Sequence, residues 1–472
     1  MKKAMSAEQR AMRSDTAREK KTGACSSLIA HCLLLGVVAF SLLSSEPAAQ
    51  AAADPTTQPL LQKSNLTYVG AFRLPKGPFP GTAYDFQYAE SGFTYYPAHN
   101  SLFINDHIYD QKTAEISIPS QITGGSNLNN LATAAILQSF ADITEGNLGN
   151  IGPGGMYEVD GLGHEMGGLM VYNNMLVGTS YGMYDGNTGA QATERSHFSH
   201  NLTVSQTGTF HGMYAVGTFN PGYVAGYMTP VPQEWQSALG GPALTGLCCV
   251  SITGRTSYGP DIFVFNPDDL GVKTPVPATP LVYYTYAHPT LGTWEGNQVN
   301  LDYNMVTGAN RGMAFPTGSR SVLIFGRQGT GVPCYGPRTT DPAMDGQPIP
   351  GGGQNYCYDV QYEWTGPHSK SNPDGSSTYK RWVWAYDAND LVTVKNGQKN
   401  PWDIKPYAVW ELVSPFGGDN LQGVGYDPAT QRLYVSLTYV DGAQPVIAVY
   451  HIELSGTPLP APRPPTNLRI AH

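Results

Sequence analysis

The chain of 472 residues contains 54 Gly, 37 Pro and 29 Tyr, and only 13% of its residues are charged. This balance is typical of many short strands joined by tight turns, and it argues against a mainly helical or a disordered protein. Residues 1–53 hold seven of the 27 Lys and Arg and four of the 36 Asp and Glu, which leaves 20 against 32 and a net charge of −12. That charge disfavours nucleic acid as a partner, because nucleic-acid binding depends on basic contacts to phosphates.

The first 53 residues have the features of a signal peptide. A basic region ends at Lys20 and Lys21, an apolar run extends from Leu28 to Leu43, and small residues at 49–53 offer cleavage sites. The apolar run has 16 residues, fewer than the roughly 20 of a membrane-spanning helix. We expect cleavage, a secreted or periplasmic protein, and no membrane span in the mature chain; an uncleaved anchor is the alternative.

After a linker at 54–65, residues 66–75 form a predicted strand with no partner directly after it. Residues 92–119 then form the first full unit, a hairpin followed by a third strand. Hairpins recur at 167–184, 211–228, 315–324 and 426–435. A small sheet of this kind cannot bury its faces alone, so the repetition predicts units arranged around a common axis, a β-propeller.

The last unit, 421–454, shows three strands and lacks a fourth. The lone strand at 66–75 could supply it and close the ring, which removes an open sheet edge. Counting hairpins gives five blades, and counting by even spacing would give seven; we favour five. The predicted fold is therefore all-β, with a single propeller over residues 66–456 and a Pro-rich tail at 457–472.

Helices are expected to be few. The best candidates are 130–142 and 232–239, and both are predicted as excursions from the ring.

Four cysteines follow the leader, an even number in a chain expected to be exported, so disulfides are the expected state. Four cysteines allow three pairings. Cys334 and Cys357 bracket a Gly- and Pro-rich insertion that a bridge would staple, and the adjacent Cys248 and Cys249 could then close on each other. The spacing matches no zinc site.

Loops at one end of a propeller bring residues from every blade together, so candidate site residues lie at strand ends and in insertions. His107 ends the second strand of the first hairpin, and it either faces the axis or is a hydrogen-bonded loop histidine. One Gly-rich segment contains Glu158, Asp160, His164 and Glu165. These groups could hold a divalent cation such as calcium, act as acid and base, or be turn residues.

Arg255 and Tyr258 follow the paired cysteines closely. A guanidinium and a phenol on a rigid loop suit recognition of a carboxylate or a sugar, although the loop could simply be braced. Arg311 and Arg327 flank the fourth hairpin, and Trp294 lies in the loop before it. An aromatic ring with nearby arginines can bind a sugar or peptide, although a Trp that caps the core is commoner.

Three segments, 232–271, 381–397 and 421–435, resemble secreted, largely uncharacterised bacterial β-propeller proteins, and the resemblance covers most of residues 66–470. More distantly, YYPAHNSLFINDH (95–107) and AEISIP (114–119) resemble blades of ulvan-lyase-type polysaccharide lyases. Those enzymes use a His or Tyr as base and acid, with an Arg that neutralises the uronate carboxylate. Matched by residue type, the resemblance implies such roles for His107, His164, Arg255 and Tyr258.

Two functions are consistent with these patterns. The favoured one is an exported propeller that binds an extracellular polysaccharide or a surface protein at a loop-lined axial pocket. The alternative is a lyase that cleaves an acidic polysaccharide by β-elimination. In that reaction Arg255 neutralises the carboxylate, Tyr258 or His164 takes the proton, and His107 protonates the leaving oxygen.

Overall fold

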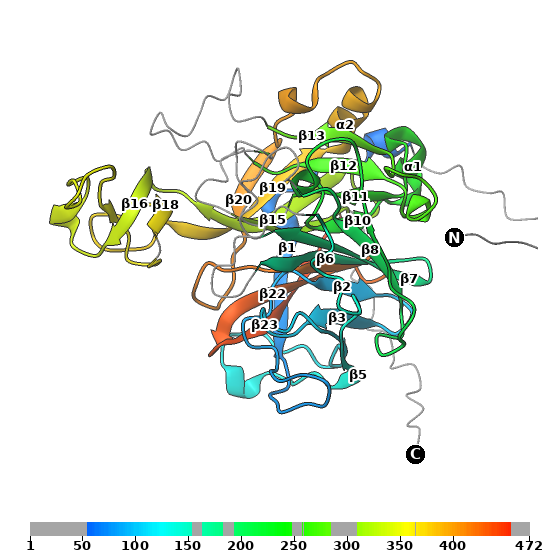
Figure 1. Cartoon of the computed structure of the whole chain (residues 1–472), viewed down its shortest axis with the longest axis horizontal. Helices are drawn as coiled ribbons and strands as arrows, with labels where there is room; N and C mark the ends of the chain where they lie inside the picture. The colour runs from blue at the N-terminus through cyan, green and yellow to red at the C-terminus, as the bar shows by residue number, and fades with distance from the viewer. Residues whose placement is uncertain are drawn as a thin grey trace, which may run out of the picture. The chain divides into compact units, whose positions relative to one another are not determined.

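The computed structural model describes residues 54–152, 163–182, 193–247, 257, 259–284, 309–363 and 365–454. Strands form most of the regular structure in these residues (Figure 1). Two α-helices occur among them, α1 (Gln233–Leu239) and α2 (Ala388–Lys395), and neither is long and apolar enough to cross a membrane. The predicted all-β class is confirmed for this part of the chain. The predicted signal peptide and C-terminal tail lie outside it.

The described residues contain five four-stranded antiparallel sheets. The first contains β2 (Phe93–Tyr96), β3 (Ser101–Asn105), β4 (Thr113–Ser117) and β5 (Ile136–Ala141). The second contains β6 (His164–Tyr172), β7 (Met175–Gly182), β8 (His197–Asn201) and β9 (His211–Tyr214). The third contains β10 (Met228–Pro230), β11 (Ala243–Thr245), β12 (Ile262–Phe265) and β13 (Ala278–Val282). The fourth contains β14 (Ala309–Ala314), β15 (Ser321–Gly329), β19 (Tyr379–Asp387) and β20 (Ala408–Glu411).

The fifth sheet joins the two ends of the described chain. It contains β21 (Val424–Asp427), β22 (Arg432–Asp441), β23 (Gln444–Ile452) and β1 (Leu66–Arg73). Leu66 lies opposite Ile452, and the pairing continues to Arg73 opposite Val446. The N-terminal strand therefore supplies the missing fourth strand of the last unit, as the sequence predicted, and it covers what would otherwise be an open edge.

The first strands of the five sheets lie beside one another. Strand β2 contacts β6 and β21, β10 contacts β6 and β14, and β14 contacts β21. One cavity of about 240 Å³ has wall residues from all five of these strands. They are Tyr95 in β2, Val171 in β6, Pro230 in β10, Met313 in β14 and Tyr426 in β21. Each lies within a residue of the end of its strand, so the five sheets converge at this cavity.

One large core lies between the third and fourth sheets, beneath the two helices. Trp235 of α1 and Trp384 of β19 are fully buried in it, together with Tyr284, whose hydroxyl lies 2.9 Å from that of Tyr386. Since these side chains come from separate sheets and helices, they fix the sheets against each other as well as burying apolar surface.

One predicted helix, 130–142, is wrong. The segment instead contains a 3₁₀ turn at Leu128–Asn130 followed by strand β5. Ala134 and Phe140 are buried on one side, while Leu137 and Ser139 on the other side are exposed. This alternation is the period of a strand, so packing against β4 overrides the helical propensity of the Ala, Leu and Gln residues.

The poorer hairpin predicted at 211–228 is also wrong. Strand β9 is the last strand of the second sheet, and β10 is the first strand of the third. The segment between them is a connection from one sheet to the next, with a 3₁₀ turn at Pro221–Tyr223. By contrast, α1 (Gln233–Leu239) confirms the helix predicted at 232–239.

Residues 54–65, expected as a linker, pack against the fourth sheet. The backbone N–H of Leu61 donates to Ser321 Oγ at 2.8 Å, and its carbonyl accepts from the Tyr407 hydroxyl at 2.6 Å. Trp235 Nε1 also donates to Gln58 Oε1 at 3.1 Å. The side chain of Leu61 is buried. This segment therefore belongs to the folded body.

An arm is inserted between β15 and β19, and Figure 1 shows it extending away from the four-stranded sheets. It contains β16 (Pro333–Thr339), β17 (Cys357–Tyr358) and β18 (Thr365–Ser369). A disulfide joins Cys334 to Cys357, with Cα atoms 5.8 Å apart, and confirms the predicted staple of this insertion. Cys248 and Cys249 lie outside the described residues.

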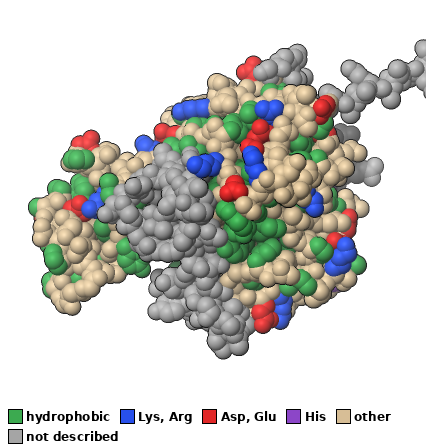
Figure 2. All heavy atoms as spheres, turned by 90° about the horizontal axis from the view of Figure 1, so that it is seen from above, with side chains coloured by type: hydrophobic (Ala, Val, Ile, Leu, Met, Phe, Trp, Pro, Cys, Tyr) green, Lys and Arg blue, Asp and Glu red, His purple; other side chains and the backbone are tan. Residues whose placement is uncertain are grey.

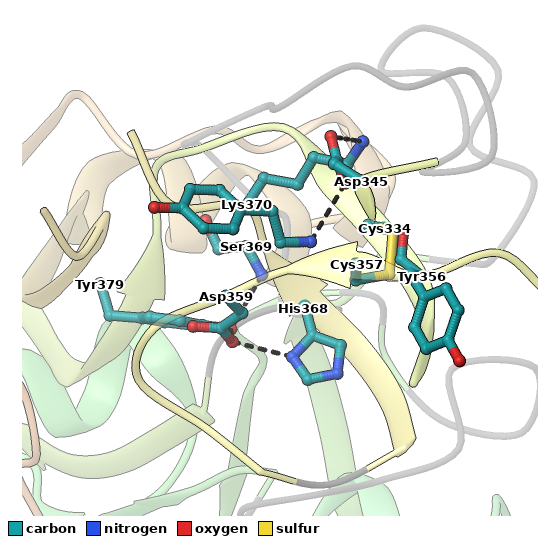
Figure 3. Close-up of a disulfide and its surroundings, with 10 residues drawn as sticks. Cys334, Asp345, Tyr356, Cys357, Asp359, His368, Ser369, Lys370 and Tyr379 are labelled. Atoms are coloured by element: carbon teal, nitrogen blue, oxygen red, sulfur yellow. Dashed lines mark hydrogen bonds and ion pairs between the residues drawn. A yellow bond between two sulfur atoms is a disulfide. The ribbon is translucent and has the colours of Figure 1, made fainter. Parts of the chain in front are cut away.

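A buried hydrogen bond between a histidine and an aspartate lies beside this disulfide (Figure 3). The ring of His368 places Nδ1 2.8 Å from Asp359 Oδ2, and both side chains are fully buried. Hydrogen bonds, the first of them from His368, hold the pKa of Asp359 below its ordinary value despite burial. Lys370 pairs with Asp345 at 2.8 Å nearby. The arm thus has its own polar core and covalent staple.

Replacing Cys334 and Cys357 by Ser is expected to destabilise the arm by about 3 kcal/mol, the chain-entropy value for a loop of this size. The five four-stranded sheets should stay folded, because β16 hydrogen-bonds only to β17 and β18 among the described strands. Hydrogen exchange measures both regions in one experiment. Amides of β16 and β18 should lose protection while those of β22 and β23 keep it; equal loss in both would contradict the prediction.

The surface drawn in Figure 2 intersperses Lys and Arg with Asp and Glu, without a broad basic area among the residues described on that face. This agrees with the net negative charge of the chain.

Candidate functional site

Arg311 and Arg327, both predicted as substrate-binding residues, line a single pocket of about 550 Å³. Arg311 belongs to β14 and Arg327 to β15. The rest of the wall is mostly polar and includes Glu90, Tyr362, Asp419, Asn420, Gln422, Thr438 and Tyr439. These residues come from the segment before β2, from the arm, and from the two sides of β21, so the pocket forms only when three separate parts of the chain meet.

A β-bulge aims Arg311 into this pocket. The pairing of β14 with β15 slips between Asn310 and Gly312, which leaves Arg311 as the extra residue. Its Nη1 donates to Glu90 Oε2 at 2.9 Å and to Ser91 Oγ at 3.1 Å. Although burial opposes the positive charge, the Glu90 carboxylate outweighs it and raises the pKa of Arg311.

Glu165 lies behind this ion pair on β6. It is 1% exposed, and the Tyr181 hydroxyl donates to its Oε2 at 2.5 Å, while Oε1 has no hydrogen-bond partner among the described residues. Burial raises the pKa of Glu165 to about 8, and the charge of Glu90 adds to the effect. The Glu165 carboxyl is therefore mostly protonated at pH 7, and Glu90 carries the charge that faces Arg311.

Arg327 is held by aromatic rings. Its guanidinium carbon lies 4.3 Å from the centre of the Tyr362 ring and 5.0 Å from that of Tyr379, which are cation–π distances. The Tyr362 hydroxyl in turn donates to Asp419 Oδ2 at 2.5 Å. Although burial opposes its charge, the pKa of Arg327 is raised by Tyr362 and Asp419. Each arginine of the pocket thus has a carboxylate nearby.

The loop at 416–422 forms one side of the pocket, and Arg381 fixes its shape. Arg381 donates to the carbonyl of Phe416 at 3.0 Å, of Gly417 at 2.6 Å and of Asn420 at 3.3 Å. A loop held by three hydrogen bonds from one guanidinium is preorganised, so a ligand would lose little free energy in ordering it.

Two wall residues carry unsatisfied hydrogen-bonding groups. Gln422 is 6% exposed and Thr438 is 4% exposed, yet Gln422 Oε1 and Thr438 Oγ1 have no hydrogen-bond partner among the described residues. Buried polar atoms are almost always hydrogen-bonded in folded proteins, because leaving them unpaired costs about 1–3 kcal/mol. The pocket wall therefore offers a donor and an acceptor to a bound molecule.

His107 lies outside the pocket wall, in a cluster of tyrosines beside it. Its ring centre is 4.2 Å from that of Tyr84, 5.0 Å from Tyr109 and 5.1 Å from Tyr88. The Tyr88 ring then contacts Tyr439, a wall residue, at 5.8 Å. Burial lowers the pKa of His107, so its ring is neutral at pH 7.

His164 is placed elsewhere. It begins β6, and its ring packs against Gly149, where a Cβ atom would lie 3.0 Å from Nδ1. Of the three carboxylates predicted as metal ligands only Glu165 is described, and the described residues contain no group of three His, Cys, Asp or Glu that could hold a metal ion. The remaining predicted site residues lie outside the described residues: Glu158, Asp160, Arg255, Tyr258 and Trp294.

Sequence reasoning missed Glu90, Tyr181, Asp419 and Tyr439. A usable signal was present at some of these positions, because polar residues stand at the start of several first strands. Glu90 precedes β2, Gln422 precedes β21, and Glu165 is the second residue of β6. Aligning the repeated hairpins by their first strands would have grouped these positions at one end of the fold.

These features define a β-propeller-like protein with a polar and partly aromatic pocket. No family model and no curated protein sequence matches the chain. Among solved structures, the chain is similar to hydrazine synthase of Kuenenia stuttgartiensis, with 9% identity and a TM-score of 0.30 over 80% of this chain and 100% of that one. It is also similar to a member of the DUF4221 family from Bacteroides vulgatus, with 9% identity and a TM-score of 0.29 over 84% and 100% of the two chains.

The resemblance to ulvan-lyase-type enzymes stays a prediction.

Proposed function

We propose that the five four-stranded sheets are the blades of one closed β-propeller that binds an extracellular glycan in the pocket of Arg311 and Arg327. Support for the ring comes from the contacts of the first strands, which lead from β2 through β6, β10, β14 and β21 back to β2. The cavity lined by all five first strands adds to this support. The pairing of β1 with β23 supplies the closure.

The observation that carries the glycan proposal is the chemistry of the pocket wall. Guanidinium, carboxylate and amide groups stand beside exposed or half-exposed tyrosine rings, and Gln422 and Thr438 carry hydrogen-bonding groups without protein partners among the described residues. Sugars present hydroxyl groups around an apolar ring face, so this mixture of rigid polar groups and aromatic faces suits them.

Binding is favoured over β-elimination because each arginine of the pocket already has a carboxylate beside it. Arg311 donates to Glu90 at 2.9 Å, and the Tyr362 and Asp419 pair lies beside Arg327. A uronate carboxylate would have to compete with these groups, whereas sugar hydroxyls could bind without breaking them. The lyase stays the alternative, with Arg255 and Tyr258 outside the described residues.

The disulfide of the arm supports the proposed extracellular or periplasmic location. Such bonds persist mainly in oxidising compartments and are rare in the cytosol.

The test is a binding titration of the mature chain against neutral and uronate oligosaccharides by calorimetry. Gln422→Ala should weaken binding about 3- to 10-fold, the usual worth of one hydrogen bond. Gln398→Ala, at an exposed glutamine beyond α2, is the matched control and should bind normally. A panel without any binder, or equal effects of both variants, would sink the proposal. Absorbance from unsaturated uronate product in the same samples would instead favour the lyase.

A further inference from the structure

In the part of the chain that the structure describes, exposed tyrosines concentrate at one place. Among the described residues, five tyrosines are strongly exposed: Tyr84, Tyr88, Tyr109, Tyr335 and Tyr439. Four of them surround His107 or contact a ring that does, and only Tyr335 lies elsewhere, on the arm. We call Tyr84, Tyr88, Tyr109 and His107 the tyrosine platform. Single exposed aromatic rings need no explanation, but a cluster of this kind marks a binding surface.

The platform is held rigidly from within. His107 is 6% exposed and stacks on Tyr84 and Tyr109 with interplanar angles of 24° and 26°. Its Nδ1 accepts a hydrogen bond from the Tyr109 backbone N–H at 3.1 Å, which ties the ring to its own loop. The tyrosines keep between 41% and 53% of their surface exposed. Rigid aromatic faces lose little conformational entropy when a ligand binds to them.

The platform continues into the pocket of Arg311 and Arg327. Tyr439 belongs to the pocket wall, and its ring centre lies 5.8 Å from that of Tyr88. Both residues have a left-handed backbone, with φ of 54° at Tyr88 and 60° at Tyr439. Such a conformation is unfavourable for a tyrosine and tends to occur at binding sites. The tyrosine platform and the pocket wall therefore form one continuous surface.

Carboxyl groups border the platform. Thr82 Oγ1 hydrogen-bonds to Asp106 Oδ2 at 2.6 Å and to Asp110 Oδ2 at 2.8 Å. The charges of Asp85 and Asp110 both act on His107. The Nζ atom of Lys112 lies 3.1 Å from Asp110 Oδ2 and offsets the charge of that carboxylate. Carboxylates accept hydrogen bonds from hydroxyl groups and repel anions, so this border favours an uncharged sugar over a uronate or a sulfated sugar.

We propose that the tyrosine platform is a second sugar-binding subsite, which takes the pyranose rings of a neutral polysaccharide whose end or neighbouring unit occupies the pocket. The proposal rests on the glycan function proposed above, and it adds the class of glycan, a neutral chain rather than a single sugar. His107 acts as a positioning residue that supports the tyrosine rings, and no bond is formed or broken.

The experiment measures Kd by calorimetry for β-1,4-linked gluco-, xylo- and manno-oligosaccharides, from disaccharide to hexasaccharide, and for oligogalacturonates as charged counterparts. For the unmodified chain, affinity should rise with length in one neutral series. The double variant Tyr84→Ala, Tyr109→Ala should bind the hexasaccharide about tenfold more weakly, because the loss of each stacking contact should weaken affinity about threefold. Binding of the disaccharide should not change.

The matched control is Tyr335→Ala, which removes an equally exposed tyrosine from the arm. Thermal unfolding of each variant shows whether it is folded, and Tyr84→Phe with Tyr109→Phe should restore the length dependence because the ring faces are kept. A double Ala variant that binds the hexasaccharide normally would overturn the subsite, and so would an equal loss in Tyr335→Ala or tighter binding of the oligogalacturonates.

The outcomes separate the two proposals. If Gln422→Ala weakens the disaccharide but the tyrosine variant has no effect, the pocket binds glycan and the subsite is wrong. If the tyrosine variant loses binding and Gln422→Ala does not, the platform binds sugar and the pocket assignment is wrong. If no oligosaccharide binds at all, both proposals fail.

Discussion

Replacing Glu165 by Gln is expected to remove a large part of the pH dependence of stability between about pH 5 and pH 8. The ordinary pKa of Glu is 4.5, and burial, with the charge of Glu90 adding to it, raises the pKa of Glu165 to about 8 although the hydrogen bond from Tyr181 opposes the shift. Between these two values the folded chain binds a proton that the unfolded chain has released. The free energy of unfolding should therefore fall as pH rises, by about 1.4 kcal/mol for each pH unit.

The amide introduced by Glu165→Gln would resemble the protonated acid in shape and would not titrate. Denaturant unfolding at several pH values is the measurement, with this variant compared with the unmodified chain. The variant should gain stability relative to the unmodified chain as pH rises from 5 to 8, by several kcal/mol at the most. Glu453→Gln, at an exposed carboxyl group, is the control. Parallel curves for Glu165→Gln and the unmodified chain would show that Glu165 is ionised in the folded state.

Arg311→Met is expected to destabilise the protein by about 3 kcal/mol, because it leaves a partly buried Glu90 carboxylate without its partner. Arg311 and Glu90 side chains are only 12% and 21% exposed, so water compensates little for the lost ion pair. Methionine keeps most of the volume of the arginine stem, which limits the cavity left behind. Chemical denaturation at pH 7 gives the change in free energy of unfolding directly.

Two further variants make this result specific. Glu90→Gln added to Arg311→Met should recover part of the loss, because the uncompensated charge is then removed, and the double-mutant cycle measures the coupling. Arg195→Met breaks an exposed pair with Glu194 at 3.2 Å, whose side chains are 43% and 57% exposed, and should cost no more than about 1 kcal/mol. If both Arg variants cost the same, the pocket ion pair has no special role in stability.

Local pattern was enough to predict most strands. The hairpins at 92–119 and 426–435 follow from alternating apolar residues and turn residues close to them in the chain. The helix predicted at 130–142 is wrong because that prediction also used local pattern alone. Ala, Leu and Gln favour a helix, but pairing with β4 makes the segment a strand. The connection at 211–228 failed because a hairpin and two strands of separate sheets look alike in sequence.

The candidate site was predicted only in part. Arg311 and Arg327 could be selected because they flank one hairpin, and both line the pocket. Glu90 could not be paired with Arg311 from the sequence, because the two residues are 221 positions apart in the chain. Only the convergence of the sheets that contain β2 and β14 brings them together.

By itself the sequence determined what depends on near neighbours: strand-forming units, the turn residues between them, an even set of cysteines and a bridge across one insertion. Only the tertiary structure decided which charges meet, why the Glu165 carboxyl keeps its proton, and how Tyr88 comes to contact Tyr439 in the wall of the pocket. The reason is physical. Secondary structure follows from local backbone and side-chain preferences, whereas burial and charge pairing depend on sheets that are distant in sequence.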